Sequence, residues 1–90
     1  MNIKKSNLFL RDIKKVKLEK SIIDKTLALF QENPNHPSLH KKQIICKRAS
    51  NLFSLRITKQ YRLLYLKYDE YIELYRVLNH DKYDRLTKDC

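Results

Sequence analysis

The chain has no glycine in 90 residues, and this absence restricts what it can fold into and do more than any other feature. Glycine is the residue that reaches positive φ angles without a steric cost. Walker A phosphate loops, G-x-G-x-x-G dinucleotide turns and G-x-S-x-G nucleophile elbows all depend on it for that reason. The sequence therefore excludes the enzyme classes that are built on these three motifs.

Positive charge is concentrated in the middle of the chain. Overall, 20 Lys and Arg stand against 10 Asp and Glu, which gives a net charge of +10. Residues 33–68 hold eight basic residues and no acidic one, whereas residues 69–90 hold four basic and six acidic residues. Because ordinary protein surfaces mix both signs, the acid-free segment predicts a surface for a partner rich in phosphate or carboxylate. The alternative is a basic face that only keeps the protein soluble.

The first third of the chain has the spacing of two helices. Apolar residues recur at intervals of three and four from Phe9 to Val16 and again from Ile23 to Phe30. Asn33-Pro34 ends the second helix, and residues 17–19 are the best candidates for the turn between the two. We therefore predict a helical hairpin, preceded by a short strand at residues 1–4.

After Pro37 the apolar period changes to two. The segment from Phe53 to Thr58 alternates apolar and polar residues, which predicts a strand with one apolar face. Residues 61–68 and 71–78 are rich in tyrosine and branched aliphatic residues and predict two further strands, and residues 41–48 are a weaker fourth candidate. Helices first and strands afterwards predict one α+β domain, residues 1–90, with an antiparallel meander on a helical hairpin. Alternation does not tell which face of the central strands meets the helices, and the acidic C-terminal residues are typical of a helical tail.

The cysteines and the apolar runs bear on the compartment. Cys46 and Cys90 do not have the spacing of a metal site, so we expect reduced thiols in a cytoplasmic protein. No apolar run exceeds four residues, which predicts that no segment spans a membrane. Residues 8–10 are too short for the core of a signal peptide.

Two arginines and two histidines are the residues best suited to act on a phosphodiester. Arg56 and Arg62 lie on neighbouring predicted strands, and the guanidinium group matches phosphate oxygens and keeps its charge. His80 directly follows the last strand and His36 precedes Pro37, and histidine transfers protons near neutral pH. The alternatives are two surface arginines and two histidines with structural roles in loops.

Tyrosines could stack on unpaired bases, but most of the six lie in predicted strands and are expected to pack there. Tyr83 is the exception, because it lies beyond the last strand and close to His80. The histidines lack the spacing of a zinc site, and the basic segment has no carboxylate cluster for a hard cation. We therefore predict no metal site.

Four segments occur in a characteristic order and spacing. They are His36-Pro37-Ser38-Leu39, Phe53-Ser54-Leu55-Arg56-Ile57-Thr58, Tyr61-Arg62-Leu63-Leu64-Tyr65 and Asn79-His80-Asp81-Lys82-Tyr83. Together they resemble the RelE/ParE toxin superfamily, most closely its YoeB and YafQ branches. The resemblance covers roughly residues 5–86, and it depends on the order and spacing of the segments more than on any one of them.

This resemblance implies a fold and a function. The fold would be two N-terminal helices against a curved antiparallel sheet of about four strands. The function would be that of the toxin in a bacterial toxin–antitoxin pair: a cytoplasmic, ribosome-dependent endoribonuclease that cleaves mRNA and so inhibits translation. The nucleophile in that reaction is the 2′-hydroxyl of the RNA, so neither a metal nor another cofactor is needed. The implied partners are an acidic antitoxin, the ribosome and mRNA.

The resemblance also assigns roles to residues. Arg62 matches the phosphate-stabilising arginine, His80 matches the C-terminal histidine used in acid–base work, and His36 falls near the histidine or glutamate of the family's loop. Arg56 fits a second RNA-contacting position, and Tyr83 fits an aromatic residue that stacks or donates a proton. The acid-free segment adds four candidate contacts to RNA phosphates, Lys41, Lys42, Arg48 and Lys59.

One departure and two alternatives remain open at this level. Asp81 follows His80 where the YoeB branch has its terminal tyrosine, and a carboxylate there would either orient His80 or repel RNA. The ParE branch has the same scaffold and acts on DNA gyrase without the ribonuclease residues. The third possibility is a basic member of the fold that binds nucleic acid without cleaving it.

Overall fold

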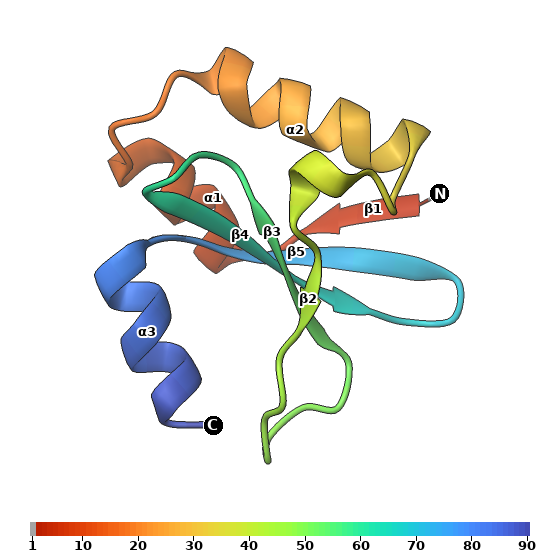
Figure 1. The fold of residues 1–90 in the computed structure, drawn as a ribbon, viewed down its shortest axis with the longest axis vertical. Coiled ribbons are helices and arrows are strands. Elements are labelled where there is room, and N and C mark those ends of the chain that lie inside the picture. Colours follow the sequence, from red (N-terminus) through yellow and green to blue (C-terminus); the bar gives the residue numbers. More distant parts are fainter. Residues whose placement is uncertain (1) are drawn as a thin grey trace.

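The computed structural model describes residues 2–90 (Figure 1). Along the chain its elements are β1 (Asn2–Lys5), α1 (Asn7–Lys15), α2 (Lys20–Glu32), the 3-10 helix η1 (Pro37–Leu39), β2 (Lys42–Gln43), β3 (Leu52–Arg56), β4 (Tyr61–Lys67), β5 (Tyr71–Asn79) and α3 (His80–Lys88). Both predicted N-terminal helices and the turn between them are therefore present. The predicted strand at residues 1–4 is present as β1, except that Met1 lies outside the described residues.

The strands form one five-stranded sheet in the order β1-β5-β4-β3-β2. The strands β2 to β5 make the predicted antiparallel meander. β1 differs from the prediction, because it lies parallel to β5 along Asn2–Lys5 and makes the sheet mixed. The remaining fold class, α+β with helices on a curved sheet, is as predicted.

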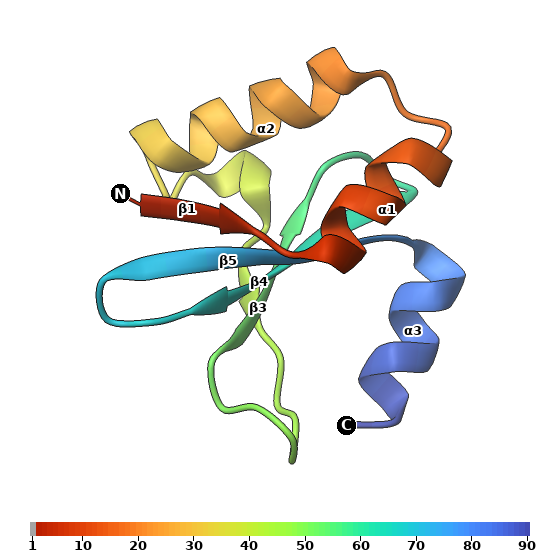
Figure 2. The same cartoon turned by 180° about the vertical axis from the view of Figure 1, so that it is seen from behind.

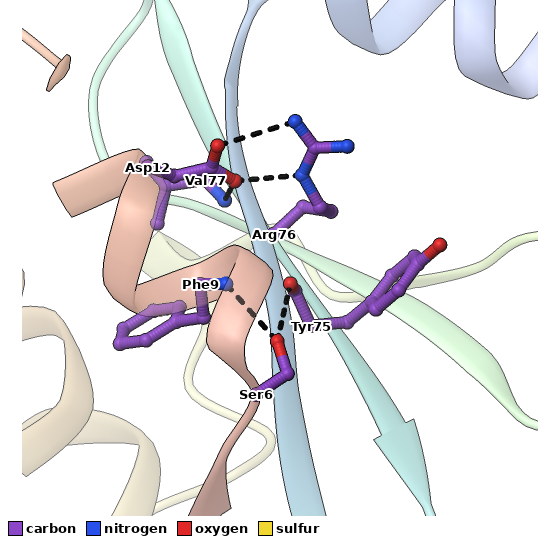
Figure 3. A network of polar contacts seen from close by, with 6 residues as sticks. All are labelled: Ser6, Phe9, Asp12, Tyr75, Arg76 and Val77. Atoms are coloured by element: carbon purple, nitrogen blue, oxygen red, sulfur yellow. Dashed lines mark hydrogen bonds and ion pairs between the residues drawn. The ribbon is translucent and has the colours of Figure 1, made fainter.

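Ser6 joins β1 to α1 and fixes both to β5 (Figure 3). Its backbone N–H donates to the Leu74 carbonyl at 3.0 Å, and its hydroxyl donates to the Tyr75 carbonyl at 2.9 Å. The same hydroxyl accepts from the Phe9 N–H at 3.0 Å, which caps the N-terminus of α1. One side chain therefore begins the helix and continues the pairing along the edge of β5.

Asp12 accepts the hydrogen bond of the next free backbone N–H along this edge of β5 (Figure 3). Its carboxylate accepts from the Val77 N–H at 2.9 Å and from Arg76 at Nε (2.7 Å) and Nη2 (3.2 Å). The hydrogen bond to Asp12 raises the pKa of Arg76 above its ordinary value. Because Asp12 is only 8% exposed, this carboxylate is bound within the fold.

The sheet is covered on both faces, with α2 and α3 on opposite sides (Figure 1, Figure 2). The larger core packs α1 and α2 on one face of the sheet, and its buried members are Phe9, Ile23, Phe30, Leu39, Leu55, Leu63, Tyr65, Ile72, Leu74 and Val77. The smaller core packs α3 on the other face, with Ile44, Leu52, Leu64, Leu78 and Tyr83. The predicted apolar face of β3 is confirmed, because Phe53 and Leu55 pack in the larger core, but the other face of this strand is not open to solvent. Ser54, on its polar face, is fully buried because α3 covers it.

Cys46 and Cys90 form a disulfide, so the prediction of reduced thiols is wrong. The two residues are 44 positions apart in the sequence, and only the return of α3 across the sheet brings the chain end beside the connection between β2 and β3. Spacing along the sequence does not carry this information. Within residues 2–90, no helix has the length and apolar character needed to cross a membrane.

Candidate active site

Arg56 and Arg62 lie directly opposite each other on β3 and β4. They project to the face that α3 covers, because Ser54, two residues before Arg56, contacts Tyr83 of α3. Neither strand is at the edge of the sheet. Like charges directly opposite each other in a sheet are destabilising, and an anion bound between the two arginines would offset this repulsion.

Arg62 has a buried donor without an acceptor. Its Nη1 is buried, and nothing in residues 2–90 accepts a hydrogen bond from it. Its Cζ lies 5.1 Å from the centroid of the Tyr83 ring, in a cation–π contact. Leaving a buried donor unpaired costs about 1–3 kcal/mol, and more for a charged group. An anionic ligand with oxygen acceptors would remove this cost.

The ring of Tyr83 packs against the guanidinium group of Arg62. It is 8% exposed, and its hydroxyl lies 3.3 Å from Ser54 Oγ. The ring is therefore fixed at one end by Ser54 and carries the guanidinium group of Arg62 on its face. This position suits a residue that orients Arg62, and the predicted stacking or proton-donating role of Tyr83 stays a prediction.

His40 is a site residue that the sequence analysis missed. Its Nε2 lies 3.2 Å from Nη1 of Arg56, and because a guanidinium group can only donate, Nε2 is the acceptor. His40 follows η1 with φ 45°, a left-handed conformation that histidine adopts more readily than most residues. The sequence contains a histidine at this position but no signal that the turn directs it towards Arg56.

His36 shapes the same turn. Its Nδ1 accepts a hydrogen bond from the Ser38 N–H at 3.1 Å, so it caps η1. No hydrogen bond or ion pair within residues 2–90 links it to Arg62 or His80. Its observed role is to begin the turn that places His40, and the predicted part in proton transfer stays a prediction.

His80 is the first residue of α3 and is exposed. Its Nε2 lies 3.3 Å from Oδ2 of Asp84, one helical turn later, so Asp84 is the carboxylate beside it. Asp81, the neighbour considered from the sequence, instead lines a hollow of about 270 Å³ together with His80 and Gln60. Tyr61 on β4 pairs with Asn79 on β5. Arg62 is the residue after Tyr61, and His80 is the residue after Asn79.

The four further basic candidates are spread over this side of the chain. Lys42 lines a hollow together with Tyr83 and Asp84. Lys41 donates to Asn35 Oδ1 at 2.7 Å, and Lys59 lies in the turn between β3 and β4. Arg48 lies in the connection between β2 and β3, near the disulfide, so the structure does not bring all four together.

A family comparison agrees with this fold. The model of the ParE-like toxin domain matches residues 20–85, and the chain therefore belongs to this family of toxin domains. It is a toxin of the kind found in toxin–antitoxin systems, and its predicted membership of the RelE/ParE superfamily is confirmed. No curated protein sequence matches the chain.

Solved structures show the same fold at low sequence identity. A copper-bound L66S mutant toxin from Helicobacter pylori is 18% identical, with a TM-score of 0.76 over 90% of this chain and 96% of that one. YafQ in the E. coli DinJ-YafQ toxin-antitoxin complex is 14% identical, with a TM-score of 0.77 over 90% and 93% of the two chains. YoeB from Staphylococcus aureus is 20% identical, with a TM-score of 0.65 over 89% and 97%.

Proposed function

We propose that this toxin is a ribosome-dependent endoribonuclease that cleaves mRNA by attack of the RNA's own 2′-hydroxyl on the neighbouring phosphate. The observation that carries the proposal is the unpaired, buried Nη1 of Arg62, opposite Arg56 on one face of the sheet. A phosphate between these guanidinium groups would give Arg62 its missing acceptor and would relieve the repulsion between the two charges.

The same geometry supports a division of roles in the reaction. The 2′-oxygen attacks phosphorus and the bond from phosphorus to the 5′-oxygen breaks, which leaves a 2′,3′-cyclic phosphate and a free 5′-hydroxyl. Arg62 and Arg56 stabilise the extra negative charge on the pentacoordinate phosphate. His80 protonates the leaving 5′-oxygen, and Asp84, whose Oδ2 lies 3.3 Å from its Nε2, orients the ring.

A base must take the proton from the 2′-hydroxyl. His40 is suited to this role, because its Nε2 already acts as an acceptor, towards Arg56. When the phosphate draws Arg56 away, this nitrogen becomes free to accept the hydroxyl proton. His36 is the second candidate for the base. It ranks after His40 because its Nδ1 already accepts from the Ser38 N–H, so only Nε2 is available to take the proton.

Cleavage of mRNA on purified ribosomes, mapped by primer extension, tests the proposal. Arg62→Ala should lower the cleavage rate by about 10²–10³-fold, because one donor to the transition state is lost. His80→Ala should lower it by about 10²–10⁴-fold, and Lys25→Ala, on the exposed face of α2, serves as the control. If both site variants cleave at the rate of the control, the site assignment is wrong.

The family match also supports a second candidate, a ParE-type toxin that acts on DNA gyrase. In that case expression would cause DNA damage responses while mRNA remained intact, and His80→Ala would not reduce toxicity. In either case we propose an acidic antitoxin as partner, given the net charge of +10 and the antitoxin complex of YafQ. Co-purification with the product of a neighbouring acidic reading frame tests this.

A further inference from the structure

We infer that a second phosphate-binding subsite for RNA lies beside the candidate active site, in a hollow between the end of α1 and the start of α3. The hollow has a volume of about 340 Å³, and three lysines, Lys15, Lys17 and Lys82, line it. The inference rests on the proposed function, because that function makes RNA the ligand. It adds a binding position on residues that lie outside the acid-free segment.

The charge of this hollow is not compensated within the described chain. All three lysines are exposed, and none has a carboxylate at ion-pair distance within residues 2–90. Asp12 is the one acidic residue lining the hollow, but its oxygens are already bound by Arg76 and the Val77 N–H. The three ammonium groups therefore remain free to bind an anion.

Its position continues the candidate active site. Tyr61 and Asn79 line both this hollow and the one that holds His80, and they are paired across β4 and β5. An RNA strand with its scissile phosphate at Arg62 and its leaving group at His80 would reach the lysines next. Lysine binds phosphate as a mobile point charge, which suits a backbone phosphate that is held but not cleaved.

An RNA backbone fits this hollow better than an acidic protein segment does. A bound amphipathic helix would need exposed apolar side chains to pack against. Val77 and Leu78 at the hollow are 1% and 3% exposed. Val16 and Tyr61 also line it and are only half-buried, but exposed lysines flank them, so the hollow offers no continuous apolar face. Sequence-independent contacts of lysine with phosphate are the usual source of RNA affinity in such a surface.

Binding of uncleavable RNA tests the inference separately from catalysis. The probes are a single-stranded 2′-O-methyl RNA, which lacks the nucleophile, and purified ribosomes without mRNA. The variant Lys15→Ala/Lys17→Ala/Lys82→Ala is compared with Lys20→Ala/Lys25→Ala/Lys88→Ala, which removes the same charge from exposed positions elsewhere. Equal thermal midpoints of the two triple variants establish that both are folded.

The variant Lys15→Ala/Lys17→Ala/Lys82→Ala should bind at least about tenfold more weakly than the control variant at 100 mM salt. For single-stranded RNA, the slope of its log affinity against log salt concentration should be shallower by about 2. A loss with the oligonucleotide identifies mRNA as the source of the phosphate, and a loss with ribosomes alone identifies rRNA. Equal affinity of the two triple variants for both probes overturns the inference, even if antitoxin binding is weakened. If the wild-type protein binds RNA through these lysines but cleaves no mRNA on ribosomes, the proposed function is contradicted and the subsite still stands.

Discussion

The Tyr65 side chain is the clearest case of an ionisable group placed in an apolar environment. Its ring lies 5.0 Å from Phe30 and 5.4 Å from Phe53, centroid to centroid, and it is 3% exposed. Burial raises the pKa of Tyr65 from 10.0 to about 12. The phenol therefore loses its proton at lower pH in the unfolded chain than in the folded one, so folding becomes less favourable as the pH rises above 10.

The higher pKa of Tyr65 in the folded protein predicts a loss of stability at alkaline pH that is caused by this residue. Between pH 8 and pH 11 it amounts to about 1.4 kcal/mol in the free energy of unfolding, measured by urea denaturation. Tyr65→Phe should remove that part of the decline, whereas Tyr68→Phe, at a residue that is 40% exposed, should leave it in place. A Tyr65→Phe protein that loses as much stability as the wild type over this range would refute the prediction.

The site itself could be predicted only in part from single residues. The opposition of Arg56 and Arg62 follows from two adjacent strands and a short turn. Arg56 belongs to a segment with a clear period of two, and Arg62 belongs to a segment rich in tyrosine and branched aliphatic residues. His40 and Asp84 could not be found in this way. Their contacts depend on a left-handed turn after η1 and on the helical register of α3, which tertiary packing selects.

At the scale of elements, the strands were predictable and their environment was not. The alternation in residues 53–58 predicts the strand and its apolar face correctly, but it carries no sign that α3 returns over the opposite face and buries Ser54. The segment 80–88 has few apolar residues, so its sequence is typical of a solvated tail. Asn79 was the available signal, since its side chain caps the helix by accepting from the Lys82 N–H at 2.9 Å.

The Cys46–Cys90 disulfide ties the end of α3 to the connection between β2 and β3. In the loop-entropy model, a closed loop of this length stabilises the folded chain by about 4 kcal/mol, and about 2–4 kcal/mol is typical. Cys46→Ser/Cys90→Ser should therefore lower the free energy of unfolding by that amount. Hydrogen exchange should show the largest loss of protection in α3, because the tether holds this helix.

Addition of a reductant provides the matched control for this prediction. It should destabilise the wild-type protein to the level of the double variant and leave the double variant unchanged. Equal stability of the oxidised wild type and the double variant would mean that α3 is held by its apolar contacts alone.

At the scale of the whole molecule, one thin sheet separates two cores of unequal size. Leu63 and Leu64 are neighbours on β4, both are fully buried, and they point into the larger and the smaller core respectively. The same change to alanine at these two positions therefore compares the two faces directly. Each should lower the free energy of unfolding by about 2–5 kcal/mol, since each leaves a cavity in a packed interior.

The two variants should differ in where the molecule loosens. Leu64 packs in the cluster that contains Tyr83, and Tyr83 carries Arg62 on its ring, so Leu64→Ala should weaken α3 and the candidate active site together. We expect exchange protection in α3 and cleavage on ribosomes to fall more in Leu64→Ala than in Leu63→Ala, at a temperature where both remain folded. If the two variants lose protection in α3 and cleavage to the same extent, then the smaller core does not hold the site, and the orientation of Arg62 must come from the strands alone.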